Sequence, residues 1–406
     1  MRNRVVITGL GVVCGLGKDV PEFWQNIVDC KSGIAPIESI DMSGLRFKNG
    51  CEVKNYDPTQ HFSKKELDLM DKFSQFALIA AKEAVKDAAI EWTDELKKRT
   101  CVITGTCIGG QDAMEETFTM LFKENKERAP LFTIPRVMPN AGASHITMEY
   151  GITGIAYAVS TACSSSNHAI GNAFWLVRNG LCDMAITGGS EVTLSYGYLK
   201  AWEAIRVVAP DTCRPFSKTR QGMVLGEGGA MLVLESLESA TKRGAKIYGE
   251  VVGFGMSSDA SHITKPNQLG AETAMQMAME DAEISPEKID YINAHGTGTM
   301  VNDAMETAAI KNVFGEHSKK LAVSATKSLH GHVLGGTSAI EAVATTLALK
   351  HQVFPPTANF EERDEECDLD VVPNKSRQGV INYALSNSFA FGGLNAVLAF
   401  KKWDRN

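Results

Sequence analysis

Short apolar runs alternate with longer segments of helical periodicity along almost the whole chain. In the first half, the expected strands cover residues 4–13, 101–109, 155–160, 183–192 and 229–236. In the second half, they cover residues 247–256, 289–296, 321–328, 380–388 and 395–402. Strands that alternate with helices in this way predict an α/β fold with mostly parallel sheets packed in layers.

The two sets of strands follow the same plan, so the chain is expected to be one long duplication with five strands in each half. Each half reads βαβαβαββ, and the third strands end alike, in VSTAC and VSATK, before a helix of small residues. The expected domains are residues 1–248 and 249–406. Reactive side chains gather at the carboxyl ends of strands in α/β sheets, so Cys163 and Lys327 are expected to face a shared pocket.

The segment STACSSS, residues 160–166, places Cys163 where a buried strand passes into a helix. The positive end of a helix dipole and unpaired N–H groups favour a thiolate, which is the reactive form of cysteine. The alternative is a cysteine that only packs in a tight turn, and this stretch alone does not exclude it.

Three polar segments follow strands of the second half, namely NAHGTGT (293–299), TKSLHGHVLGG (326–336) and SNSFAFGGLN (386–395). A nucleophilic cysteine needs donors for an oxyanion and histidines that polarise a carbonyl or move a proton. Flanking glycines allow a substrate to approach the backbone closely. One histidine beside glycines is usually structural, but two such segments together with Cys163 favour catalysis.

Composition and charge exclude several classes of function. The chain has 406 residues and a net charge of −7, which argues against general nucleic-acid binding. Its nine cysteines form no CxxC pair, so neither a disulfide framework nor a zinc knuckle is indicated, and a cytoplasmic location is expected. The start, MRNRVVITGLGVV, reads as a first strand and not as a signal peptide, and no apolar segment is long enough to span a membrane.

Taken together, these motifs resemble those of the β-ketoacyl-[acyl carrier protein] synthases of the thiolase superfamily, over nearly the whole chain. TACSSS is similar to the nucleophile motif, NAHGTGT and TKSLHGH to the histidine and lysine motifs, and SNSFAFGGLN to the C-terminal gating loop. The resemblance implies a thiolase-like fold, with five-stranded mixed sheets in α/β/α/β/α layers. It implies a triad of Cys163, His295 and His332 supported by Lys327, with Glu306 as the partner of the lysine. Thr297 and Thr299 match residues that touch a phosphopantetheine arm.

The reaction implied by the resemblance is a decarboxylative Claisen condensation. An acyl group held on Cys163 would be attacked by the enolate of malonyl-[acyl carrier protein], giving a 3-ketoacyl product. The backbone N–H groups of Cys163 and Phe391 would form the oxyanion hole, and His295 and His332 would hold the malonyl thioester oxygen. Loss of CO₂ drives the step, so no metal or redox cofactor is expected.

The sequence also departs from the family pattern. His330 stands where threonine is common, and the resulting HxH pair lacks a third ligand nearby, which disfavours a metal site. Ala390 replaces a frequent glycine of the gating loop. The segment 199–217 looks most like enzymes that serve nodulation-factor lipids and aryl polyenes, rather than housekeeping fatty acid synthesis.

Rival families fit less well. A biosynthetic thiolase would need a second cysteine in SFAFGGLN, and an initiating synthase would carry Cys, His and Asn in place of the Lys327 and His332 pattern. The non-enzyme alternative is a chain-length factor, the inactive partner subunit of some polyketide systems, which usually lacks the cysteine.

An acidic acyl carrier protein would need a basic patch on this acidic chain. Its expected contacts are Lys64, Lys65, Lys126 and Arg128, although each could be ordinary solvated charge. Ile108, Phe391 and Met138 are expected in the acyl pocket, Met138 from a neighbouring subunit, whereas Trp202 and Met223 are expected in the core. The active form is expected to be a homodimer or a heterodimer with a chain-length-factor homologue.

Overall fold

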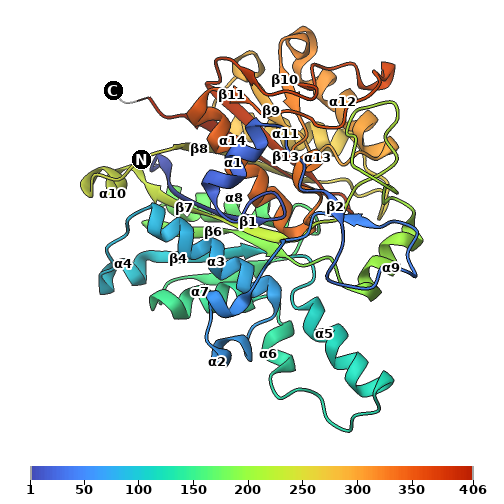
Figure 1. Ribbon diagram of the computed structural model, residues 1–406. Coiled ribbons are helices and arrows are strands. Elements are labelled where there is room, and N and C mark those ends of the chain that lie inside the picture. Colours follow the sequence, from blue (N-terminus) through green and yellow to red (C-terminus); the bar gives the residue numbers. More distant parts are fainter. Residues whose placement is uncertain (1, 405–406) are drawn as a thin grey trace.

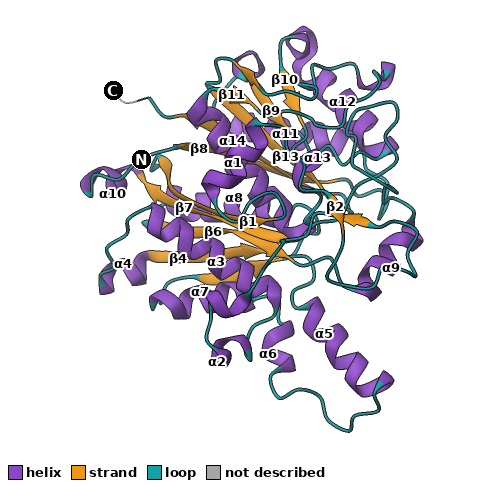
Figure 2. Cartoon of the chain, viewed as in Figure 1, coloured by secondary structure: helices purple, strands orange, loops and turns teal. Residues whose placement is uncertain are grey.

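The computed structural model describes residues 2–404, and its main sheet has ten strands in two sets of five. The N-terminal half contributes β1 (Val5–Cys14), β4 (Thr100–Gly105), β5 (Ala156–Val159), β6 (Met184–Glu191) and β7 (Gly228–Ser236). The C-terminal half contributes β8 (Gly249–Ser258), β9 (Tyr291–Asn293), β10 (Ala322–Ser324), β13 (Tyr383–Phe389) and β14 (Leu394–Lys402). All ten expected strands are therefore present, and Figures 1 and 2 show them crossing the middle of the molecule.

The two sets have the same internal order. Counted from the seam between the halves, the N-terminal set runs β1, β7, β6, β4, β5 and the C-terminal set runs β8, β14, β13, β9, β10. At the seam, β1 and β8 pair antiparallel over three residues, from Val5 opposite Val251 to Ile7 opposite Gly249. Two five-stranded sets were expected, and this short pairing joins them into one continuous ten-stranded mixed sheet.

Helices cover both faces of each set. The helices of the N-terminal half are α1 (Val20–Val28), α2 (Lys64–Leu67), α3 (Lys72–Asp87), α4 (Asp94–Arg99), α5 (Gln111–Phe118), α6 (Thr133–Val137), α7 (Ala141–Tyr150), α8 (Ser165–Arg178), α9 (Tyr196–Ile205) and α10 (Leu237–Lys242). Those of the C-terminal half are α11 (Gln268–Asp281), α12 (Met300–Phe314), α13 (Lys327–His330) and α14 (Thr337–His351). Four short strands, β2 (Ala35–Pro36), β3 (Asn49–Gly50), β11 (Val353–Phe354) and β12 (Arg377–Gln378), form two small ribbons.

The layers place two helices at the centre. α8 and α14 pack against strands of both halves and against each other. α3 and α7 cover the outer face of the N-terminal set, and α11 covers that of the C-terminal set, with α12 packed against α11. Residues 337–349 of α14 are all buried, as expected for a helix of small and apolar residues enclosed on every side. At Gly171 of α8, an added Cβ would lie 2.4 Å from the Phe254 ring, so glycine permits the close contact with β8. The first turns of the two central helices meet, since the Asn167 amide of α8 donates to the Ser338 hydroxyl of α14 at 2.9 Å.

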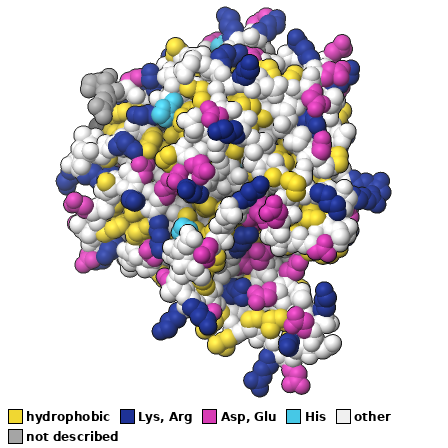
Figure 3. All heavy atoms as spheres, viewed as in Figure 1, with side chains coloured by type: hydrophobic (Ala, Val, Ile, Leu, Met, Phe, Trp, Pro, Cys, Tyr) yellow, Lys and Arg dark blue, Asp and Glu magenta, His cyan; other side chains and the backbone are white. Residues whose placement is uncertain are grey.

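Segments outside the repeated plan lie at the surface. α5 and α6 project from the body at the lower edge of Figure 1, and α9 lies at the right. The projecting segment exposes large apolar side chains, namely Phe118, Phe122, Leu131, Phe132 and Ile134. Figure 3 shows cationic and anionic side chains intermixed over this face of the molecule, without one dominant sign. Within residues 2–404, no helix is long and apolar enough to cross a membrane.

Candidate active site

The nucleophile turn is held by its own hydroxyl groups. Ala162 has a φ of +52°, a left-handed conformation that turns the chain from β5 into α8. The Ser165 hydroxyl donates to the Ala162 carbonyl at 2.6 Å and accepts from the Thr161 amide at 2.9 Å. The Ser164 hydroxyl donates to the carbonyl of Leu394 at 2.8 Å. Several polar side chains around the cysteine therefore bond the backbone of a strained turn and fix the position of Cys163.

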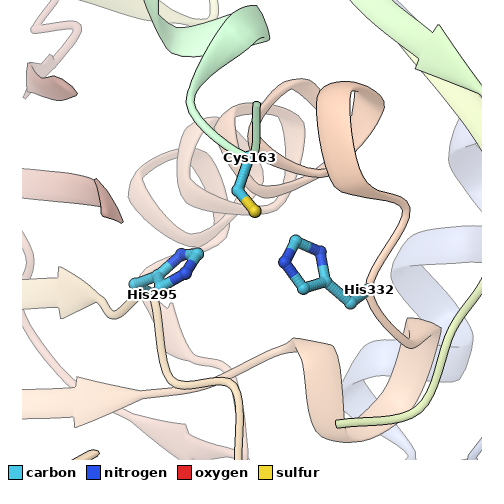
Figure 4. Close-up of side chains that lie close together, drawn as sticks. All are labelled: Cys163, His295 and His332. Carbon is cyan, nitrogen blue, oxygen red and sulfur yellow. The ribbon is translucent and has the colours of Figure 1, made fainter. Parts of the chain in front are cut away.

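Three side chains from different elements meet beyond this turn. Cys163 precedes α8, His295 follows β9, and His332 follows α13. Their sulfur and ring nitrogen atoms all lie within 4.8 Å of one another. The two imidazole rings are 5.7 Å apart and nearly perpendicular, and Figure 4 shows the Cys163 sulfur pointing toward the space between them. All three residues are buried. The expected triad is thus assembled by the structure.

Lys327 is fully buried and pairs with a residue that was not expected. Its Nζ donates to Glu341 Oε1 at 2.6 Å and to the backbone carbonyl of His295 at 2.6 Å. The expected pairing with Glu306 is wrong, because the Glu306 carboxylate instead accepts the N–H groups of His295 and Gly296, each at 2.8 Å. Both acidic residues therefore act on the His295 segment, Glu341 through the lysine and Glu306 directly.

The sequence held one signal for Glu341. It is the only charged residue in the run TSAIEAVATTLAL, which is otherwise small, apolar or hydroxylated. An isolated acidic residue in such a buried helix requires a cationic partner. Its cationic partner, Lys327, is set by the packing of α14 against α13, and no local sequence pattern predicts that contact.

The thiol of Cys163 is not a preformed thiolate. Burial raises its pKa to about 11, although the charge of Lys327 and the amide N–H groups of Phe391 and Cys163 itself lower it. The expectation of a depressed pKa at a helix start is therefore wrong, since desolvation outweighs the helix-start effect. The two amide groups that face the sulfur are those expected to form the oxyanion hole.

Both imidazoles of the triad are neutral. Burial, reinforced by the charge of Lys327, lowers the pKa of His295 and of His332 well below the usual range. The His332 Nδ1 accepts the amide N–H of Leu334 at 3.1 Å and lies 2.9 Å from the Thr337 hydroxyl. Because Nδ1 accepts, the single proton of the ring is on Nε2, and His332 presents a hydrogen-bond donor at its remaining nitrogen.

His330 has a different environment from His332. Its Nε2 bonds the Thr326 hydroxyl at 3.0 Å, its Nδ1 lies 2.8 Å from the Gly331 carbonyl, and its ring packs near Phe23. Burial lowers its pKa to about 3. The two histidines of LHGH therefore do not share a metal ion, and only His332 lies beside Cys163.

A cavity of about 460 Å³ leads to the triad. Its walls include Thr297 and Thr299, whose hydroxyls are 3.0 Å apart. Trp202 and Met223 are buried in a core cluster, as expected, and both also line the cavity. The Trp202 ring is stacked on Phe391 at 5.9 Å, so α9 forms one wall of the site.

Two cationic residues of the cavity wall were missed from the sequence. Arg206, at the end of α9, and Lys265, in the loop after β8, are both exposed and line the cavity. Lys265 directly follows the segment GMSSDASHIT, which is also similar to a segment of the β-ketoacyl synthases, so its position was a usable signal. Phe389, Ala390, Phe391 and Gly393 bring the expected gating loop to the same cavity.

Other expected residues lie away from this cavity. Ile108 and Met138 are partly buried and do not line it, and the Ile108 amide N–H bonds the buried Glu191. Four basic residues expected to contact a carrier are exposed, on α2 and on the loop before α6, namely Lys64, Lys65, Lys126 and Arg128. None of these four lines the cavity.

Profiles of known protein families match both halves of the chain that carry these site residues. The profile of the Beta-ketoacyl synthase, N-terminal domain matches residues 2–240, and that of the C-terminal domain matches residues 248–361. The chain belongs to the β-ketoacyl synthase family. Nodulation protein E of Rhizobium leguminosarum bv. trifolii is 46% identical to this synthase over 402 residues, which cover 99% of this chain and 100% of the relative.

Two further relatives agree with this assignment. 3-Oxoacyl-[acyl-carrier-protein] synthase 2 of Synechocystis sp. is 43% identical over 410 residues, 99% of each chain. The solved structure of the ishigamide ketosynthase/chain length factor is similar to this synthase with a TM-score of 0.95 and 36% identity, covering 100% of both chains. The resemblance to a ketosynthase with a thiolase-like fold is thereby confirmed, and the protein is an acyltransferase.

Proposed function

We propose that this synthase condenses an acyl group, held on Cys163, with malonyl-[acyl carrier protein] to give a 3-ketoacyl-[acyl carrier protein] and CO₂. One observation carries the proposal. A thiol, two neutral imidazoles and two backbone N–H groups converge at one end of a cavity whose mouth reaches the surface. This set matches the needs of a reaction that forms a thioester and then develops negative charge on oxygen.

In the first half-reaction, the Cys163 sulfur attacks the carbonyl of an incoming acyl thioester. Negative charge develops on the carbonyl oxygen, and the amide N–H groups of Cys163 and Phe391 are placed to hold it. The thiol proton leaves with the departing carrier thiol, so an acyl-cysteine forms and the carrier is released as a free thiol. Because the thiol pKa is about 11, the fixed charge of Lys327 assists ionisation during the attack.

In the second half-reaction, a malonyl thioester occupies the same cavity. The Nε2–H of His332 donates to its thioester oxygen, and His295 donates from the other side. The C–C bond to the carboxylate breaks, CO₂ leaves, and the electron pair forms an enolate whose carbon attacks the acyl-cysteine. Cys163 leaves as a thiolate and regains a proton. Each fixed donor at a developing oxyanion contributes about 3–4 kcal/mol by analogy with other oxyanion holes.

Lys327, Glu341 and Glu306 act as positioning residues. The Lys327 ammonium donates to the backbone carbonyl of His295. The Glu306 carboxylate accepts the backbone N–H of His295. Because these partners are buried, the His295 ring is fixed before substrate arrives, and little reorganisation is needed during the reaction.

The acyl carrier protein is proposed to deliver both substrates on a phosphopantetheine arm. Thr297 and Thr299 would contact the arm inside the cavity. The cationic Arg206 and Lys265 at the wall would attract an acidic carrier, with Lys64, Lys65, Lys126 and Arg128 as further docking residues. The proposed reaction draws its driving force from loss of CO₂ and needs no metal or redox cofactor.

The synthase is proposed to work as a dimer. β5 is the edge strand of the N-terminal set, so one side of its backbone has no strand partner within residues 2–404. Tyr157 of β5 and the preceding Ile155 are exposed there. A solved relative is described as a ketosynthase/chain length factor, so the partner is a second copy or such a homologue. Met138 would then reach the partner's acyl pocket. The free thiols support a cytoplasmic location. The 46% identity to Nodulation protein E is in keeping with the proposal of a specialised pathway.

A chain-length-factor-like role with little activity is the alternative, and the assembled triad argues against it. The test is mass spectrometry of the protein incubated with a panel of acyl-loaded carrier proteins. An acyl adduct on Cys163 and a 3-ketoacyl product after addition of malonyl carrier are expected. No adduct with any chain, alone or beside a homologous partner, would overturn the proposal.

A further inference from the structure

The three groups that face the substrate also form a set of metal ligands. Zn²⁺ binds cysteine sulfur at about 2.3 Å and histidine nitrogen at about 2.0–2.1 Å, so a tetrahedral site places its ligand atoms about 3.3–3.6 Å apart. The sulfur of Cys163 and the ring nitrogens of His295 and His332 all lie within 4.8 Å of one another. Side-chain rotations that draw them together by about 1 Å would give three ligands around one centre.

The surroundings of these ligands suit a bound cation. Within residues 2–404, the His332 Nε2 makes no hydrogen bond, whereas Nδ1 accepts the Leu334 amide N–H and lies 2.9 Å from the Thr337 hydroxyl. The Nδ1 of His295 is buried without a hydrogen-bond partner within residues 2–404. The cavity supplies access from solvent and room for a water at the fourth position, the arrangement of a zinc site with one open ligand.

We propose that the Cys163–His295–His332 cluster binds one thiophilic divalent cation, Zn²⁺ in the first instance, and that this cation excludes the acyl group. On binding, the S–H bond breaks, the sulfur becomes the ligand, and its proton passes to solvent. The His332 proton moves from Nε2 to Nδ1, where the Thr337 hydroxyl accepts it. The site then holds metal or an acyl-cysteine, since both use the same sulfur electron pair.

Two features limit the affinity. Moving the proton to Nδ1 of His332 removes the hydrogen bond from the Leu334 amide, and Lys327 places a positive charge near the site. Zinc would therefore be exchangeable by a chelator, unlike the zinc of a closed structural site. The resting protein would bind zinc in this way whether or not it catalyses the condensation.

The experiment measures metal content and not turnover. Reduced full-length protein is dialysed against buffered Zn²⁺, and zinc per chain is measured by elemental analysis for the wild type, Cys163→Ala, His332→Ala and His330→Thr. The last variant is the matched control, because it removes the neighbouring histidine that lies outside the cluster. Cys163→Ala and His332→Ala are expected to lose one equivalent that the wild type and His330→Thr retain.

A second measurement uses Co²⁺ as a spectroscopic probe. The wild type and His330→Thr are expected to show a sulfur-to-cobalt charge-transfer band that Cys163→Ala lacks. Zinc is also expected to protect Cys163 of the wild type from iodoacetamide, which keeps the test valid if a variant does not fold. Equal zinc in wild type and Cys163→Ala, or alkylation of Cys163 unchanged by zinc, would overturn the proposal.

Discussion

Replacing Ala390 by glycine is expected to widen the range of acyl chains that load onto Cys163. Ala390 is buried in the cluster around the nucleophile, and it has a negative φ, whereas Gly392 and Gly393 have φ values of +84° and +69°. The gating loop is closed by two backbone bonds, from the Gly393 amide to the Ala390 carbonyl at 2.9 Å and from the Gly392 amide to the Ile263 carbonyl at 2.7 Å. Alanine is thus compatible with the closed loop.

The magnitude follows from backbone entropy. At a position whose native backbone conformation alanine adopts without strain, alanine disfavours the other backbone conformations by about 0.4–1 kcal/mol relative to glycine. Ala390→Gly should therefore shift the balance between closed and open loop by a factor of about two to five. Acylation by poorly matched saturated chains, which depends on loop opening, is expected to accelerate by that factor. Malonyl decarboxylation, which needs no acyl chain to enter, should change little.

The assay is single-turnover acylation of Cys163 by a series of carrier-bound chains, read by mass spectrometry. Ala396→Gly is the matched control, because it removes a buried methyl group from β14 outside the gate. Thermal unfolding of both variants separates a loss of stability from a change in gating. Identical relative rates across the chain series in wild type and Ala390→Gly would refute the reasoning and place selectivity in the tunnel walls.

Three further results are expected. The rate at which iodoacetamide alkylates Cys163 should rise about tenfold per pH unit up to the thiol pKa of about 11, because only the thiolate reacts. A rate that is constant above neutral pH would contradict the raised pKa. His332→Ala should suppress malonyl decarboxylation, measured as CO₂ release, while His330→Thr leaves it largely intact; equal losses would reverse the assigned roles. Charge reversal at Lys64 and Lys65 should raise KM for carrier-bound substrate but not for a small thioester, and an unchanged KM would place the docking patch elsewhere.

Much of the fold could be predicted because its strands are continuous apolar runs. The segments VSTAC and VSATK end equivalent strands, β5 and β10, and this likeness was enough to place Cys163 and Lys327 at a common edge. The pairing of β1 with β8 could not be foreseen, because it involves three residues from each strand and no distinctive pattern.

The site was harder to predict where long-range packing decides the chemistry. The helix-start argument for Cys163 used local sequence, whereas its pKa is dominated by burial among residues that are distant in the chain. Trp202 is buried in the core as its composition suggests, but its stacking on Phe391 of the gating loop, which also makes it line the cavity, could not be predicted from sequence. The Lys327–Glu341 pair joins α13 to α14 through their packing, which no spacing rule specifies.

The position of β1 has a consequence for how the chain acquires its structure. β1 pairs with β7 from Val5 opposite Ser236, and with β8 from Val5 opposite Val251, so its partners are made more than 200 residues later. During synthesis at the ribosome, the backbone groups of this apolar segment stay unpaired on both sides until most of the chain has emerged. Such distant contacts slow folding and leave a hydrophobic strand prone to aggregation meanwhile. Recombinant yield should therefore respond to chaperones that shield extended apolar segments.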